Sequence, residues 1–137
     1  MRFEYLFLAD AANQAANGKM NVLGMGVRIL TYAALPAASP LAIVGAVEAA
    51  VAEAGDYPLV VELVEPDGTV EEIVKATAKV PSEVTDVRLP TGMGFTIALT
   101  RPFRKEGIHY IRASFGDQQA SFAFAVGLLP DAAATTR

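Results

Sequence analysis

The feature that most constrains this chain is an alternation of side chains with a period of two. It is clearest in residues 59–64 and 70–80. In the first run Leu59, Val61 and Leu63 alternate with Val60, Glu62 and Val64. A period of two places alternate side chains on opposite faces of a β-strand, whereas a helix repeats about every 3.6 residues. Between these runs, Glu65-Pro66-Asp67-Gly68-Thr69 supplies turn chemistry, because Asp-Gly accepts the positive φ of a tight hairpin. The sequence therefore predicts a β-hairpin here.

The same reading extends along the chain and predicts short strands joined mostly by turns. They are expected at 3–8, 20–30, 41–52, 59–64, 70–80, 95–100, 108–115 and 122–126. The Ala-rich stretch 41–52 also suits a helix, but β-branched Ile43, Val44 and Val47 favour a strand. Seven or eight strands predict one all-β domain over residues 1–129, an antiparallel β-sandwich. Residues 130–137 form an Ala/Thr-rich tail.

Composition excludes several classes of function. The chain has no Cys and one His, so disulfides, thiolate nucleophiles and Cys- or His-rich metal centres are excluded. A net charge of −4 argues against nucleic-acid binding. The longest weakly polar stretch, 41–54, is too short to cross a bilayer, and Met1-Arg2-Phe3-Glu4 does not resemble a secretory signal. We therefore expect a cytoplasmic protein, or part of a particle assembled there, without metal or other cofactor and without membrane or nucleic-acid partners.

Two stretches near the amino terminus carry a family resemblance. Leu8-Ala9-Asp10-Ala11 is followed by Asn17-Gly18-Lys19-Met20-Asn21-Val22-Leu23-Gly24. A strand ending in Ala-Asp, followed by Gly-Lys-x-Asn-x-x-Gly, resembles the signature of an uncharacterised family of small bacterial proteins. The resemblance covers the chain except its tail and implies an immunoglobulin-like β-sandwich with no established activity. The Cys pair and Trp of a true immunoglobulin domain are absent from this sequence.

A few polar residues are candidates for a site in the loops. They are Asp10, Lys19, Arg101, Arg104, Lys105 and His109. Asp10 and Lys19 flank the first predicted loop, and we favour a structural role for them over a binding one. The three basic residues at 101–105 suit contact with an acidic protein partner, or simply form a solvated loop. His109 is the one candidate proton shuttle, but alternation places it on the same strand face as Ile111, opposite Tyr110. We expect Tyr110 to be a core residue. We therefore expect no catalytic residue and a non-enzymatic protein.

Several strands are apolar on both faces, and 53% of the residues are hydrophobic, against about 45–50% in typical domains. A sandwich buries one face of each sheet, so the second apolar face must be covered by loops, by the tail or by another chain. The candidate contact residues are Tyr5, Phe7, Leu23, Met25, Val44, Ala46 and Ala50. We expect a homo-oligomer or a subunit of a larger assembly, such as a phage particle, a secretion machine or a filament, formed through a sheet face or an edge strand.

A second hypothesis is a module that binds a small ligand or a carbohydrate. Its site would use loops at one end of the sandwich, near Asp56-Tyr57, Thr85-Asp86 and 101–109. An enzyme is the third hypothesis, and it would require His109 and a carboxylate close to a nucleophilic Ser. The sequence leaves the partner and the biological process open.

Overall fold

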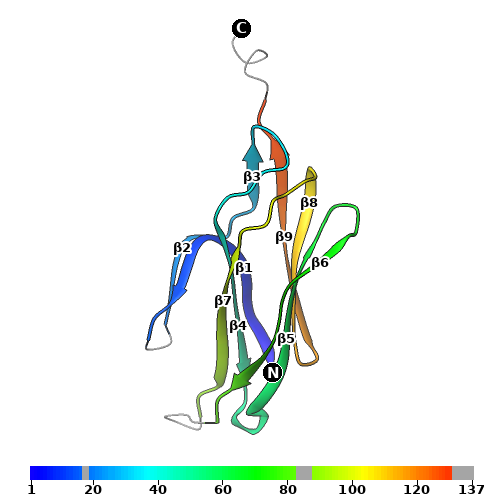
Figure 1. Cartoon of the computed structure of the whole chain (residues 1–137). Coiled ribbons are helices and arrows are strands. Elements are labelled where there is room, and N and C mark those ends of the chain that lie inside the picture. The colour runs from blue at the N-terminus through cyan, green and yellow to red at the C-terminus, as the bar shows by residue number, and fades with distance from the viewer. Residues whose placement is uncertain (17–18, 83–87, 131–137) are drawn as a thin grey trace.

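A computed structural model describes residues 1–16, 19–82 and 88–130 of the chain (Figure 1). In these residues the strands are β1 (Arg2–Gln14), β2 (Met20–Met25), β3 (Ile29–Tyr32), β4 (Leu41–Ala49), β5 (Gly55–Val64), β6 (Val70–Val80), β7 (Thr91–Leu99), β8 (Gly107–Phe115) and β9 (Gln118–Leu128). A single turn of 3-10 helix, η1 (Val51–Glu53), joins β4 to β5.

The strands form two sheets packed into a β-sandwich. The four-stranded sheet has the order β2-β1-β4-β7, and the five-stranded sheet has the order β3-β9-β8-β5-β6. The all-β sandwich predicted from the sequence is confirmed. Two details differ: the described residues hold nine strands rather than seven or eight, and β3 runs parallel to β9 while the other pairs are antiparallel.

The best-predicted elements are those with strong local signals. The Ala-rich stretch predicted as a strand over 41–52 is strand β4 as far as Ala49, and η1 follows it. The Asp-Gly turn joins β5 to β6, with the amide of Glu65 donating to the carbonyl of Thr69 over 2.8 Å. Gly68 in this turn has φ +88°, which a residue without a Cβ adopts freely.

The amino-terminal third differs from the prediction. The first predicted loop, expected between Asp10 and Lys19, is strand as far as Gln14, and the single strand predicted over 20–30 is two strands in different sheets. The division follows Gly26, whose φ of +82° breaks the extended backbone before the chain crosses to β3.

The core lies between the inner faces of the two sheets. Its largest buried side chains are Phe103, Phe115, Phe124, Leu8, Ile43, Leu63, Leu99 and Ile111. Gly45 on β4 is part of this packing, because an added Cβ would lie 2.3 Å from the ring of Phe95. Phe103 lies in the β7–β8 connection, and its bridge to Ala37 joins that connection to the one before β4.

Candidate interaction surfaces

The end of β1 and the whole of β2 form a hairpin over the outer face of the four-stranded sheet. We call this hairpin, residues 10–14 and 20–25, the arm. Strand β1 pairs with β4 as far as Ala9 and with β2 from Ala9 onward, so the arm begins where β1 leaves β4. Figure 1 shows β1 curving at this point, so that the arm projects to one side of β4 and β7.

The underside of the arm contacts the sheet through small and apolar side chains. Ala12 and Val22 pack against a buried cluster of Ala9, Ala42 and Val44, which is separate from the main core. Near the tip, Met20 reaches β7, and its terminal methyl would lie 2.7 Å from a Cβ added to Gly94. The chain itself therefore covers the part of this sheet's second apolar face that surrounds Ala42 and Val44.

Some of the predicted contact residues are exposed, whereas others are buried beneath the arm. Tyr5, Leu23, Met25 and Ala50 are exposed, with 71% exposure for both Leu23 and Met25, and Phe7 is half-buried against the small cluster. Val44 and Ala46 are buried, at 0% and 7% exposure. The expectation that these two present an outward surface is wrong, because the arm lies over this part of β4.

A second apolar surface, which the sequence reasoning missed, lies on the outer face of the five-stranded sheet. We call it the band, and it consists of Ile29, Val64, Val70, Ile108, Tyr110, Ala123 and Ala125. The ladder places Ala125 beside both Ile29 and Ile108, and it places Tyr110 beside both Ala123 and Val64, which in turn pairs with Val70. The signal in the sequence is that both faces of the strand are apolar at residues 108–111.

Four large members of the band are exposed: Ile29 at 71%, Ile108 at 48%, Val70 at 45% and Tyr110 at 43%. The expectation that Tyr110 is a core residue is wrong, because the inward positions of β8 are those of His109 and Ile111. Because these side chains are exposed, no segment in the part of the chain that the structure describes covers them as the arm covers Val44.

The predicted basic cluster is engaged within the chain. Arg101 forms an ion pair with Glu71, and Nζ of Lys105 lies 2.7 Å from Glu65 and 2.6 Å from Asp67. Hydrogen bonds from Lys105 and from the backbone of Thr69 hold the pKa of Asp67 well below its usual value. The hydrogen bonds to both carboxylates raise the pKa of Lys105. These contacts join the β5–β6 turn to the β7–β8 connection, whereas Arg104 is exposed beside them.

Asp10 and Lys19 do not flank one loop. Asp10 lies inside β1 and packs against Gly24, where an added Cβ would meet its carboxylate at 2.0 Å. Lys19 lies at the other end of the hairpin, where its carbonyl accepts a hydrogen bond from the amide of Ala15. The expectation is wrong because β1 continues past Asp10 as the first strand of the arm. Asn17 and Gly18 lie outside the described residues.

His109 lies in the core rather than in a loop site. It is 1% exposed, its ring stacks on Phe124 at 5.5 Å and meets Phe103 edge-on at 5.4 Å. Burial lowers its pKa, against smaller opposing effects from the Gly107 carbonyl, 3.2 Å from Nδ1, and from Glu65. The predicted placement on the face of Ile111 is confirmed, and its inclusion among the loop candidates is wrong.

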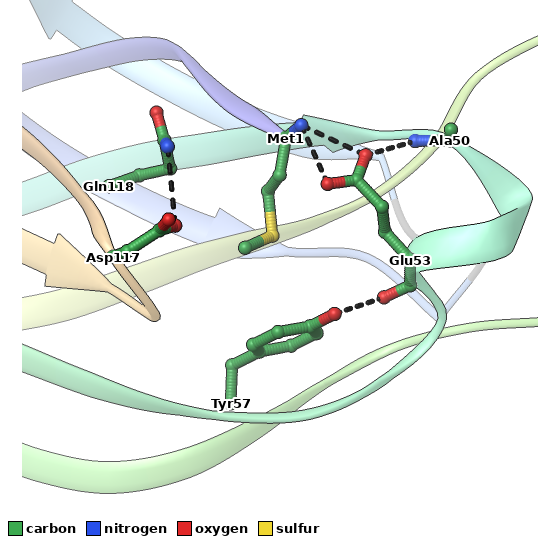
Figure 2. A network of polar contacts seen from close by, with 6 residues as sticks. All are labelled: Met1, Ala50, Glu53, Tyr57, Asp117 and Gln118. Atoms are coloured by element: carbon green, nitrogen blue, oxygen red, sulfur yellow. Dashed lines mark hydrogen bonds and ion pairs between the residues drawn. The ribbon is translucent and has the colours of Figure 1, made fainter.

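A polar cluster fixes the start of β1 (Figure 2). The α-amino group of Met1 donates to both carboxylate oxygens of Glu53, at 2.9 and 2.8 Å, and the amide of Ala50 donates to the same carboxylate at 3.0 Å. The hydrogen bond with the amino group lowers the pKa of Glu53. Tyr57 donates to the carbonyl of Glu53, and Figure 2 shows Asp117 and Gln118 beside this cluster. The arrangement anchors β1 to η1.

The loops of the ligand-binding hypothesis do not share one end of the sandwich. Asp56 and Tyr57 open β5 near Phe115, whereas residues 101–109 lie where β5 ends, because Val64 pairs with Tyr110. Thr85 and Asp86 lie outside the described residues. Among the described residues, no three His, Asp or Glu side chains are placed to hold a metal ion. No helix in the described segments is long and apolar enough to cross a membrane.

Comparison with known proteins places the chain in a family of unknown function. A family model, that of a family of unknown function termed DUF6941, matches residues 4–126. The chain belongs to this family. The DUF6941 match agrees with the resemblance to an uncharacterised family and extends from β1 into β9. No curated protein matches the chain.

Solved structures similar to this DUF6941 chain include those of a β-glucosidase from Listeria innocua. The complex with isofagomine has a TM-score of 0.53 and 12% identity, and the complex with gluconolactone has 0.52 and 13%. In both cases the similarity covers 92% of this chain and 16% of the enzyme chain. At this identity the likeness shows the fold alone, over a small part of the enzyme's length.

Proposed function

We propose that this DUF6941 chain is a non-enzymatic structural or protein-interaction module that self-associates or is built into a larger protein assembly. The observation that carries the proposal is the arm, which presents Leu23 and Met25 to solvent at 71% exposure each. Burying apolar surface contributes about 25 cal/mol per Å², so two long side chains on a projecting hairpin favour a protein contact.

The edge of the arm supports the same proposal. Among the strands that the structure describes, β2 pairs only with β1, so one side of its backbone is a sheet edge. Edge strands are usually protected by charges or Pro, but Met20-Asn21-Val22-Leu23-Gly24-Met25 has neither. In contrast, the edge strand β6 carries Glu71, Glu72, Lys75 and Lys79. The unprotected edge suits addition of a strand from a partner.

The remaining parts of the proposal rest on the sequence. The net charge of −4, with Arg101 and Lys105 paired inside the chain, favours a protein partner over nucleic acid. An immunoglobulin-like subtype, a bacterial origin and a cytoplasmic location, or a particle assembled there, are proposed from the family resemblance and composition.

Light scattering behind a sizing column, over a wide concentration range, tests the proposal. We expect a mass above 14.4 kDa that rises with concentration. Leu23→Glu combined with Met25→Glu should return the mass to that of the monomer. The control, Thr77→Glu with Gln119→Glu, adds the same charge at exposed positions outside the arm and should behave as the original chain. A monomer at every concentration would contradict self-association.

A further inference from the structure

The arm and the band lie on opposite sides of the sandwich. The arm covers the outer face of the four-stranded sheet, and the band lies on the outer face of the five-stranded sheet. An inference about how they are used rests on the proposed function, because it names the partner of the exposed arm.

Apart from Asp10, whose carboxylate packs against Gly24, the arm carries no charged side chain, and the band carries none. The outward side chains of the arm include Ala11, Leu23 and Met25, and the band contains only aliphatic side chains and Tyr110. The adjacent row of the five-stranded sheet is charged, with Arg112 beside Glu62 and Glu62 beside Glu72. An uncharged surface bounded by a charged row suits an uncharged partner, because burying an unpaired charge costs several kcal/mol.

The dimensions of the two surfaces also match. The longer strand of the arm, β2, is about 17 Å long from Met20 to Met25 at about 3.3 Å per residue. The band crosses five strands, which at about 4.8 Å apart span about 19 Å. The arm is therefore long enough to reach across most of the width of the band.

The side chains differ in a complementary way. Leu23 and Met25 are long and project from the arm, whereas the band has short Ala123 and Ala125 next to Ile108 and Tyr110. Two arms placed face to face would oppose long side chains to long ones. An arm placed on the band lets long side chains lie over short ones, as packed apolar surfaces require.

We propose that the arm of one copy docks on the band of a second copy. Because the two surfaces are different, this contact is head to tail and repeats from copy to copy, which gives a ring or an open chain. The footprint, about 17 Å by about 10 Å for a two-stranded arm, is well below the roughly 800 Å² per partner of a stable complex. The association is therefore reversible and is favoured at high concentration.

Two variants, each lacking one surface, test the direction of the contact by sedimentation at high concentration. The arm variant is Leu23→Glu with Met25→Glu, and the band variant is Ile108→Glu with Tyr110→Glu. Each should be monomeric alone, and a one-to-one mixture should form a dimer of about twice 14.4 kDa, since each variant supplies the surface that the other lacks.

Other results overturn the head-to-tail contact in distinguishable ways. A band variant that still self-associates indicates arm-to-arm contact, an arm variant that does so indicates band-to-band contact, and a mixture that stays monomeric excludes docking of arm on band. A monomeric original chain contradicts the proposed function itself. Circular dichroism checks folding, and Ile29→Glu, at a 71% exposed edge position, replaces the band variant if that variant is unfolded.

Discussion

The apolar residues on the outer faces of the two sheets are shielded from solvent to different extents. Both carry apolar residues, and a sandwich core covers neither of them. On the four-stranded sheet, Val44 is 0% exposed because the chain folds its own arm over β4. On the five-stranded sheet, Ile108 is 48% exposed and no described segment covers it.

The difference teaches that an apolar outward strand face does not by itself mark a contact with another chain. A long first strand that leaves its sheet at Ala9 is enough to bury one such face internally. Two surfaces then remain for partners. One is the outer side of the arm, and the other is the band, which the arm does not reach.

The largest expected effect comes from placing a charge on each outer face. Val44→Lys should destabilise the fold by about 4 kcal/mol or more, because it buries an unpaired charge under the arm. Ile108→Lys, in contrast, should change stability by no more than about 0.5 kcal/mol, because its side chain reaches solvent. Urea denaturation measures both.

Val44→Ala extends the same comparison if the lysine variant does not fold. It should cost about 2 kcal/mol through loss of buried methyl groups. Equal losses of stability from substitutions at positions 44 and 108 would contradict the account that the arm covers Val44 whereas Ile108 is exposed.

A smaller effect is expected at the base of the arm. Gly24→Ala should cost about 2 kcal/mol, because Gly24 has φ +68° and an added Cβ would meet Asp10. Gly26→Ala is the matched control: its φ is +82°, but nothing lies within 4 Å of an added Cβ, so about 1 kcal/mol is expected. Thermal unfolding of both variants measures the difference, and equal losses would show that Asp10 does not pack on Gly24.

The pH dependence tests the inner side of the five-stranded sheet. Burial lowers the pKa of His109 below its ordinary value of 6.5, so the unfolded chain binds a proton more readily than the folded chain. Stability should therefore be complete above pH 6.5 and should fall as the pH drops below it. His109→Phe removes the chain's one His and should flatten this dependence between pH 7.5 and 5.5. An unchanged slope in denaturation midpoints would contradict the assignment.

The smallest effect is expected at the exposed ion pairs beside the band. Asp67→Asn weakens the contact with Lys105, whose stabilising effect is present above the ordinary pKa of Asp67 and is lost as the pH falls toward its lowered value. We expect a slight loss of stability at pH 7 that disappears in concentrated salt, because exposed charges are screened. A loss that persists in salt would instead indicate a role for the Asp67 carboxylate in the turn itself.

Much of the fold is predictable because its signals are local. The Asp67-Gly68 turn determines the β5–β6 hairpin, and the β-branched residues of β4 outweigh the helix preference of Ala. The placement of His109 on the core face follows from the same alternation. These signals depend only on neighbours along the chain.

The sequence does not predict the arm, because its decisive contacts join residues far apart. Nothing local to Ala12 or Val22 shows that they pack on Ala42 and Val44, and so the burial of Val44 was not predicted. The parallel pairing of β3 with β9 is equally non-local. The band was missed for a related reason, since strand order decides which apolar positions become neighbours on one face.

The most direct test of whether the arm covers Val44 while Ile108 is exposed uses the absence of Cys from this chain. Val44→Cys and Ile108→Cys each introduce one thiol, and the rate of its labelling by a small reagent at low protein concentration reports its access to solvent. We expect the thiol at position 108 to react as fast as in the denatured chain and the thiol at position 44 to react far more slowly. Fast reaction at both positions would contradict the account, because it would show that the arm does not cover the outer face of the four-stranded sheet.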